Sequence, residues 1–209
     1  MTDTIIYHID VNSAFLSWQA KYMLEHGETD VDIRDIPSAV GGSEEHRHGI
    51  VLAKSSSAKK YGVHTGEPLV QARKKCPGLF VVPPRFDIYV ENSKAFLSLL
   101  KEHTPIVEQY SIDEAFLDMT GMELLHGEPV AYAHKLKDEI KERLGFTVNI
   151  GVSVNKLLAK MASDFTKPDR VHSLFPEEIP EKLWVLPIED LFYVGHSTAK
   201  KLKQLGIHT

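Results

Sequence analysis

The order of strand-like and helix-like segments is the feature that most limits the folds open to this chain. A β-branched and aromatic run over residues 4–9 predicts a buried strand that presents Asp10 at its carboxyl end, and residues 13–25 predict a helix. Apolar periodicity and turn residues further predict strands at 37–42, 50–53, 79–82 and 146–152, a hairpin at 107–118, and helices at 55–61, 68–76, 87–103, 130–144 and 155–165.

This order is the one that a split βαβ ferredoxin-like sheet with an insertion would give. The insertion would span roughly residues 17–78. After Pro168 the composition shifts, with further prolines among short helices, and this suggests a second small unit. We therefore predict an α+β fold, a ferredoxin-like sheet with an inserted small domain and the start of a helical unit at the end.

The charge balance looks unfavourable for a nucleic-acid partner when it is averaged over the chain. There are 24 Lys and Arg against 29 Asp and Glu, a formal net charge of -5, and phosphate binding relies on basic side chains. The charges are segregated, however, because residues 1–50 and 101–150 are acidic whereas residues 51–100 carry a net +5. The average therefore does not exclude a nucleic-acid partner.

The cysteine count and the pattern of apolar residues count against disulfide-rich, zinc-binding, secreted and membrane-spanning proteins. A single cysteine, Cys76, excludes a disulfide framework and a Cys-rich zinc site. His46 and His48 have no further ligand at a recognisable spacing, so we expect them to be structural or solvated. With no signal-peptide pattern and no run of eighteen apolar residues, we expect a cytoplasmic protein.

Three carboxylates stand in strand-like apolar surroundings. Asp10 ends the first predicted strand, and Asp113 and Glu114 lie inside the run 110–118. Charges in such runs are costly unless they are paired or bind metal. Neighbours on a regular strand point to opposite faces, so Asp113 and Glu114 can share a metal only if a tight turn falls there. If that turn lies next to the end of the first strand, three hard oxygen ligands converge and suit a pair of Mg²⁺ ions for phosphoryl transfer.

The same residues also fit simpler roles. An Asp-Glu pair can be a solvated turn, and Asp10 can cap the helix that follows it. Lys54, Lys59 and Lys60 cluster near a predicted helix start, where free N–H groups favour phosphate, but each can also be a solvated lysine. The residues by themselves leave both interpretations open.

Several stretches together resemble the Y-family translesion DNA polymerases of the bacterial polymerase IV and V type, with their UmuC domain. In order and approximate spacing these stretches cover nearly the whole chain. They are residues 8–15, 41–42, 58–63, 111–118, 151–156, 159–160 and 167–168.

The resemblance implies a palm at residues 1–16 and 79–168, fingers at 17–78 and a partial thumb at 169–209. It implies a DNA-directed DNA polymerase of low fidelity that performs translesion synthesis in DNA repair, by attack of a primer 3'-hydroxyl on the α-phosphate of a dNTP. By position, two Mg²⁺ ions, for which Mn²⁺ can substitute, would be held by Asp10, Asp113, Glu114 and the carbonyl of Val11.

Nucleotide-binding positions follow from the same resemblance. Phe15, next to Ala14, matches the bulky side chain that clashes with a ribose 2'-hydroxyl, although a plain core position fits its periodicity too. Lys167 matches a triphosphate-binding lysine. Where the family often has Thr, Tyr and Arg, this chain has the residues Ala53, Ser56 and Lys59. These departures put triphosphate contact through that segment in question, because lysine offers a point charge rather than a fork.

DNA contact and partners are also implied by the resemblance. Residues 191–202 resemble a helix-hairpin-helix that grips the DNA backbone, but Tyr193 replaces its first glycine and Gly195 alone keeps the close approach. Family members carry a C-terminal little-finger domain, expected beyond Thr209, which would also hold the contact to a sliding clamp. We therefore expect this chain by itself to bind primer-template DNA weakly and to extend it poorly.

Two other functions are compatible with such a core. A nucleotide cyclase uses a related ferredoxin-like core and two metals, but the inserted basic block and the thumb-like tail count against it. A catalytically silent DNA-binding accessory protein would be consistent with the changes at Ala53, Ser56 and Tyr193, yet all three carboxylates are present.

Overall fold

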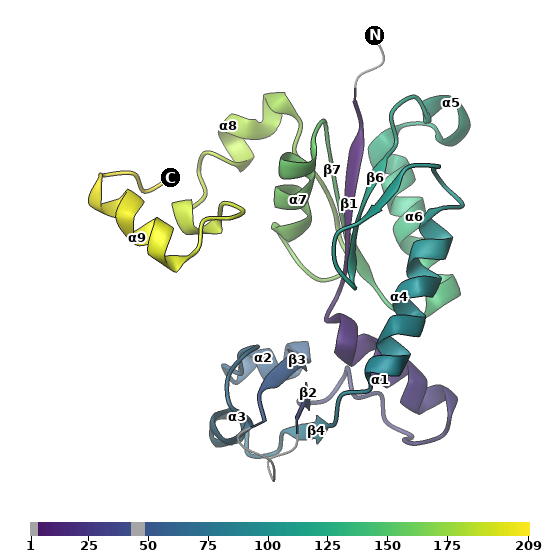
Figure 1. Cartoon of the computed structure of the whole chain (residues 1–209), viewed down its shortest axis with the longest axis vertical. Helices are drawn as coiled ribbons and strands as arrows, with labels where there is room; N and C mark the ends of the chain where they lie inside the picture. The colour runs from purple at the N-terminus through teal and green to yellow at the C-terminus, as the bar shows by residue number, and fades with distance from the viewer. Residues whose placement is uncertain (1–3, 43–48) are drawn as a thin grey trace. The chain divides into compact units, whose positions relative to one another are not determined.

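A computed structural model describes residues 4–42 and 49–209, so His46 and His48 lie outside the described residues. The chain divides into two compact units, and Figure 1 labels most of their helices and strands. The first unit consists of Met1–Asp10, Leu97–Arg143 and Thr147–Thr209, and the second consists of Val11–Phe96 and Leu144–Phe146.

A five-stranded sheet forms the centre of the first unit, with the strand order β5-β6-β1-β7-β8, and Figure 1 labels its strands β6, β1 and β7. Its strands are β1 (Ile6–Val11), β5 (Val107–Gln109), β6 (Glu114–Asp118), β7 (Val148–Ser153) and β8 (Val171–Ser173). The central strand β1 pairs antiparallel with β6, and β6 pairs antiparallel with β5, whereas β7 and β8 are parallel. The predicted hairpin is therefore the β5–β6 pair, and the mixed sheet agrees with the predicted α+β class.

Helices cover both faces of this sheet. The Tyr7 hydroxyl donates a hydrogen bond to the Pro129 carbonyl at the start of α6 (Pro129–Leu144), whereas His8 Nδ1 lies 2.8 Å from Ser163 Oγ on α7 (Lys156–Asp164). Because successive side chains of a strand point to opposite faces, α6 and α7 lie on opposite faces of the sheet.

Helix α7 lies against β7 at a distance that only glycine permits. A Cβ atom on Gly151 would stand 1.9 Å from the Ala159 carbonyl oxygen and 2.5 Å from the Ser163 amide nitrogen, both backbone atoms of α7. The helix begins at a side-chain cap, because Asn155 accepts a hydrogen bond from the Leu158 N–H at 2.9 Å. The missing side chain at Gly151 thus fixes the position of α7 on the sheet.

Residues 169–209 pack on α7 through an apolar cluster. Met161 and Leu158 of α7 meet Leu174, Leu183 and Phe192 of the later segment. The remaining elements of this unit are α5 (Glu123–His126), η2 (Pro176–Glu178), α8 (Ile179–Lys182), η3 (Ile188–Asp190) and α9 (His196–Gln204). Within the described ranges, the structure has no helix that is both long and apolar enough to cross a membrane.

The second unit is built on a three-stranded sheet of order β3-β2-β4. Its elements are α1 (Ala14–Glu25), β2 (Ser38–Gly41), β3 (Val51–Lys54), α2 (Ser56–Lys60), α3 (Leu69–Lys75), β4 (Phe80–Val82) and most of α4 (Phe86–Leu100). Val51, Leu69 and Cys76 belong to its buried core. Cys76 is thus a small core residue of this unit.

The structure differs from the sequence prediction in three places. The first strand extends to Val11, so Asp10 lies inside the hydrogen-bonded ladder rather than just after it. Helix α5 was not predicted, because it has four residues and no apolar face, with Leu124 98% exposed. Strand β8 has three half-buried residues and depends on its pairing with β7, which no local pattern encodes.

We expect Gly151→Ala to destabilise the protein by about 3 kcal/mol, because overpacking against backbone atoms cannot be relieved by a side-chain rotation. Gly78→Ala is the matched control, since no atom lies within 4 Å of a Cβ built there. Urea denaturation of both variants and the wild type measures the difference. A free energy of unfolding for Gly151→Ala within about 0.5 kcal/mol of wild type would contradict the close approach of α7.

Candidate active site

Asp10 and Glu114 face each other at the end of the ladder between β1 and β6, where β1 is finishing and β6 begins. They are direct partners in the antiparallel β1–β6 register, and both belong to the face that α7 covers. Their side chains are only 13% and 16% exposed. Two carboxylates that are directly opposite and largely buried repel each other, so positive charge close to them stabilises their ionised forms.

Asp113 is joined to this pair by the turn that precedes β6. Tyr110 and Ser111 both donate their backbone N–H to the Glu114 carbonyl, which closes a tight turn just before the strand. The Ser111 hydroxyl lies 2.6 Å from Asp113 Oδ1 and 3.4 Å from Glu114 Oε2. The tight turn that the sequence required for Asp113 and Glu114 to act together is therefore present.

Two lysines supply the positive charge. Lys160 of α7 donates a hydrogen bond to Glu114 Oε1 and lies 3.6 Å from Asp10 Oδ2. Lys167, just beyond the helix, lies 2.7 Å from the same Asp10 oxygen and 2.8 Å from Asp164 Oδ1. The result is a carboxylate–lysine cluster made of Asp10, Glu114, Lys160, Asp164 and Lys167.

Burial and charge act in opposite directions on this cluster. Burial raises the pKa of Asp10 above its ordinary value, although Lys167 and Lys160 oppose the shift. Burial would lower the pKa of Lys160, but its hydrogen bond to Glu114 and the charges of Asp164 and Asp10 raise it above the ordinary value. Burial would likewise lower the pKa of Lys167, but Asp10 and Asp164 raise it above the ordinary value. Both amines are therefore held as ammonium ions.

A buried neutral histidine lies beneath the cluster. The Ser163 hydroxyl donates to the Lys160 carbonyl at 2.8 Å, so its oxygen accepts from His8 Nδ1 and the proton of His8 resides on Nδ1. His8 Nε2 is then a bare lone pair, 3.9 Å from Glu114 Oε1. Burial lowers the pKa of His8 to about 3, with Lys160 contributing in the same direction.

The donor set of the cluster fits a cation. Oxygens of Asp10 and Glu114 converge on one ammonium group, and carboxylate oxygens are the ligands that Mg²⁺ prefers. Within residues 4–42 and 49–209, no three His, Cys, Asp or Glu side chains are already gathered around one point as a metal site. The pair Asp10–Glu114 thus offers oxygens of the kind that a cation takes, and in this structure Lys160 provides the positive charge beside them.

The sequence as a whole was compared with known proteins. A model of the impB/mucB/samB family matches residues 9–164, which is most of the chain. The chain belongs to the impB/mucB/samB family. A model of the HHH motif of that family also matches residues 176–207, so the predicted helix-hairpin-helix segment is confirmed for this family member.

Curated proteins similar to this chain are named DNA polymerase IV. DNA polymerase IV of Clostridium acetobutylicum is 55% identical over 205 residues, which are 98% of this chain and 51% of that protein. DNA polymerase IV 1 of Bacillus subtilis is 40% identical, with 98% and 48% covered. The chain spans about half the length of the curated relatives it matches.

The likeness in structure confirms the fold class and the Y-family resemblance. The crystal structure of DinB from Sulfolobus solfataricus is 31% identical with a TM-score of 0.83, covering 98% of this chain and 58% of that one. A Y-family DNA polymerase chimera is 30% identical with a TM-score of 0.83, and an insertion ternary complex of Dbh DNA polymerase is 30% identical with a TM-score of 0.84, both at the same coverage.

Other predicted site residues of this family member belong to the second unit. Phe15, on the first turn of α1, is half-buried and stacks on Tyr89 with ring centroids 4.6 Å apart. The Phe15 and Phe86 rings form a T-shaped pair with centroids 6.2 Å apart, and the Tyr89 hydroxyl donates a hydrogen bond to Gln19. Phe15 is therefore a rigidly supported ring, whereas its neighbour Ala14 is buried at the start of the helix.

The segment that is predicted to contact the triphosphate contains only a short helix, α2. Helix α2 has five residues, and the Ser55 hydroxyl already accepts the Ala58 N–H at its start. Ser56 and Lys59 are exposed, whereas Ala53 is buried in β3. Contact with phosphate through this segment would thus rely on the exposed side chains of Ser56 and Lys59 rather than on a helix terminus.

The helix-hairpin-helix segment keeps a glycine-like backbone at Tyr193. Tyr193 has a φ of 68°, in the left-handed region that favours glycine, and its hydroxyl lies 3.1 Å from the Tyr110 hydroxyl. Gly195 is the N-cap of α9, and a Cβ there would meet no atom within 4 Å. Tyr193 therefore retains the backbone conformation expected of the glycine that it replaces.

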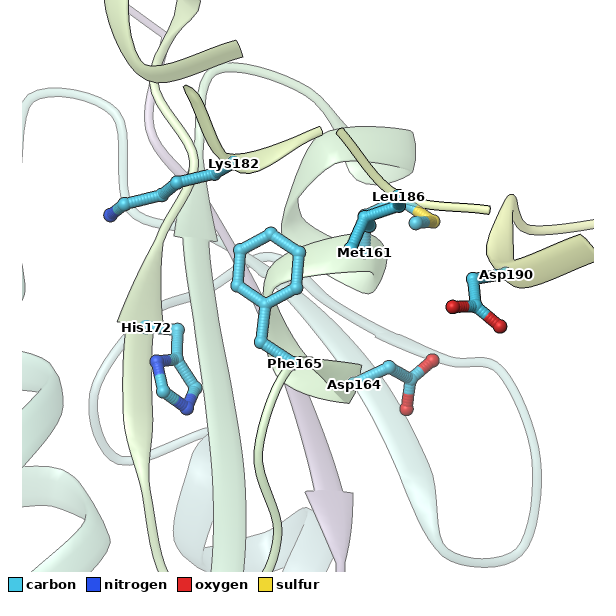
Figure 2. A pocket seen from close by; sticks show the side chains of 7 residues that line it. All are labelled: Met161, Asp164, Phe165, His172, Lys182, Leu186 and Asp190. Atoms are coloured by element: carbon cyan, nitrogen blue, oxygen red, sulfur yellow. The ribbon is translucent and has the colours of Figure 1, made fainter. Parts of the chain in front are cut away.

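Sequence reasoning missed Lys160, Asp164 and Ser111 as members of the site. Both Lys160 and Asp164 belong to a helix with an ordinary amphipathic pattern. The sequence offered one signal for Lys160, because this lysine stands between apolar residues on the face of the helix that is buried. Figure 2 shows a pocket next to the cluster, where Asp164 and Asp190 lie on one side of Phe165 and His172 on the other. Of the carboxylate–lysine cluster, only Asp164 lines this pocket.

We expect His8 to make the protein less stable in acid. Because its folded pKa of about 3 lies below the ordinary 6.5, unfolding takes up a proton between these values, so stability is full above pH 6.5 and falls as the pH decreases. At pH 5 this contribution has decreased by about 2 kcal/mol.

Urea denaturation between pH 8 and pH 5 measures this slope. His8→Gln should flatten it whatever the variant's absolute stability, and replacement of the exposed His134 on α6 should not. An equal slope in wild type and His8→Gln would contradict the buried neutral state of His8.

Proposed function

We propose that this chain carries the catalytic centre of a DNA-directed DNA polymerase of low fidelity, which copies past damaged template bases in DNA repair. The observation that carries the proposal is the cross-strand pair Asp10–Glu114, held with Lys160 and Lys167 on one face of the sheet. The names of the relatives support it. In this reaction a primer 3'-hydroxyl forms a bond to the α-phosphorus of a dNTP while the bond to pyrophosphate breaks.

The carboxylates would hold the metal ions of this reaction. Asp10, Asp113, Glu114 and the carbonyl of Val11 would bind two Mg²⁺ ions, or Mn²⁺ in their place. Such ions, when bound, supply charge stabilisation to the attacking and leaving oxygens. The Ser111 hydroxyl, which donates to Asp113 Oδ1 at 2.6 Å, would keep that carboxylate oriented for the task.

Other side chains would bind the nucleotide. Lys167 has its ammonium group at Asp10 and would donate to phosphate oxygens there, as the resemblance implies. Ser56 and Lys59 would contact the triphosphate by their positions in the resemblance. Phe15, with Ala14 beside it, would press on the sugar and exclude a 2'-hydroxyl.

The domain assignment follows the same proposal. Residues 1–16 and 79–168 would be the palm, 17–78 the fingers and 169–209 part of the thumb, with Gly195 at the DNA backbone. The partners would be primer-template DNA, dNTPs and a sliding clamp, in the cytoplasm.

Primer extension by the complete gene product with Mg²⁺ and dNTPs tests this function. Asp10→Asn, Asp113→Asn and Glu114→Gln should each reduce the rate at least about 100-fold, roughly 2.7 kcal/mol of transition-state stabilisation. Glu108→Gln is the matched control, because Glu108 is an exposed carboxylate on the neighbouring strand β5.

Each outcome separates the polymerase from its alternatives. Wild-type rates in Asp113→Asn and Glu114→Gln would contradict the two-metal assignment. Turnover of ATP or GTP without a primer would instead indicate a nucleotide cyclase, and DNA binding without extension by the wild type would indicate a silent accessory protein.

We expect Phe15→Ala to raise incorporation of NTP relative to dNTP at least about tenfold, because the clash with the 2'-hydroxyl would be removed. Phe86→Ala, which removes another ring of the same aromatic cluster, should leave the ratio unchanged. Single-nucleotide incorporation with matched dNTP and NTP measures both variants. An unchanged ratio in Phe15→Ala would remove Phe15 from this role.

A further inference from the structure

Lys160 occupies the position of a bound cation in the carboxylate–lysine cluster. Its side chain is 8% exposed and lies within reach of three carboxylates. Lys160 Nζ donates to Glu114 Oε1 and is 3.6 Å from Asp10 Oδ2 and 3.5 Å from Asp164 Oδ2. Lysine is rarely buried without such partners, so this ammonium is held by the charges around it.

The backbone that carries Lys160 cannot move away easily. The Ser163 hydroxyl, itself paired with His8 Nδ1, donates to the Lys160 carbonyl, and Gly151 lets α7 contact β7 directly. Only the side chain of Lys160 is therefore free to change position. A second acceptor is available to it, because Asp164 lies one helical turn further on and is 44% exposed.

Lys167 differs from Lys160 in its surroundings. Its side chain is 36% exposed and lies beyond the end of α7, where it bridges Asp10 and Asp164 at the edge of the cluster. Of these two lysines, it is Lys160 that donates to Glu114 and lies within 3.6 Å of Asp10 as well. It is therefore Lys160 that competes for the oxygens a metal ion would use.

We propose that Lys160 is a built-in counter-cation, which stabilises the metal-free site and is displaced from Asp10 and Glu114 toward Asp164 when a divalent ion binds. The inference rests on the proposed function, since that function supplies the metal. Two cations cannot share the same carboxylate oxygens at close range without strong repulsion. Lys160 therefore lowers metal affinity and prevents the two bare carboxylates from destabilising the fold.

Binding of Mn²⁺ to the chain without DNA or nucleotide, followed by electron paramagnetic resonance, tests the proposal. Lys160→Met should bind Mn²⁺ at least tenfold more tightly than wild type, and should melt at a lower temperature than wild type in EDTA. Lys156→Met is the matched control, because Lys156 lies one turn away on α7 with its ammonium exposed and paired with Glu108. It should bind Mn²⁺ as the wild type does.

Asp164→Asn tests the displaced position of the ammonium. It should weaken Mn²⁺ binding in the wild-type background and have a smaller effect when Lys160 is already methionine, because the two residues then no longer interact. Equal effects of Asp164→Asn in both backgrounds would overturn the proposed movement.

A measurement on the wild-type chain does not depend on how the variants fold. The side-chain ¹⁵N resonance of Lys160 should shift when Mg²⁺ is added, and that of Lys156 should not. A Lys160 signal that is unchanged at saturating Mg²⁺, or equal Mn²⁺ affinity in wild type and Lys160→Met, would overturn this inference alone. Absence of Mn²⁺ binding in both would overturn the metal assignment of the proposed function as well.

Discussion

The pairing of two buried carboxylates with two ammonium groups is the interaction on which the first unit depends. Asp10 and Glu114 meet across adjacent strands with little access to water, where each bare charge would cost several kcal/mol. Lys160 and Lys167 offset that cost. Replacement of one cation by another at these oxygens is what the proposed metal binding would involve.

The cluster is precise because it is built on regular elements rather than on loops. Both carboxylates lie in strands, Lys160 lies in a helix, and Gly151 lets that helix reach the sheet. The hydrogen bonds from His8 through Ser163 to the Lys160 carbonyl fix the helix at the same place. The packing that stabilises the fold therefore also sets the distances within the site.

Much of the fold could be predicted, because its longer elements have strong local patterns. The predicted helix at 155–165, the hairpin at 107–118 and the carboxylates within apolar runs were all found. Helix α5 and strand β8 could not be predicted, since both are short and β8 depends on its neighbour. The role of Lys160 was missed for a related reason, because a lysine in an amphipathic helix is ordinary until the helix is placed on the sheet.

The sequence by itself determined the kinds of element, their order, the family and the acidic residues at issue, since these depend on residues close together in the chain. Only the tertiary structure decided which charges meet. Lys167 and Asp10 are 157 residues apart and Lys160 and Glu114 are 46 apart. Their contact depends on strand register and on a backbone approach at Gly151, which are set by packing between distant segments and have no local pattern.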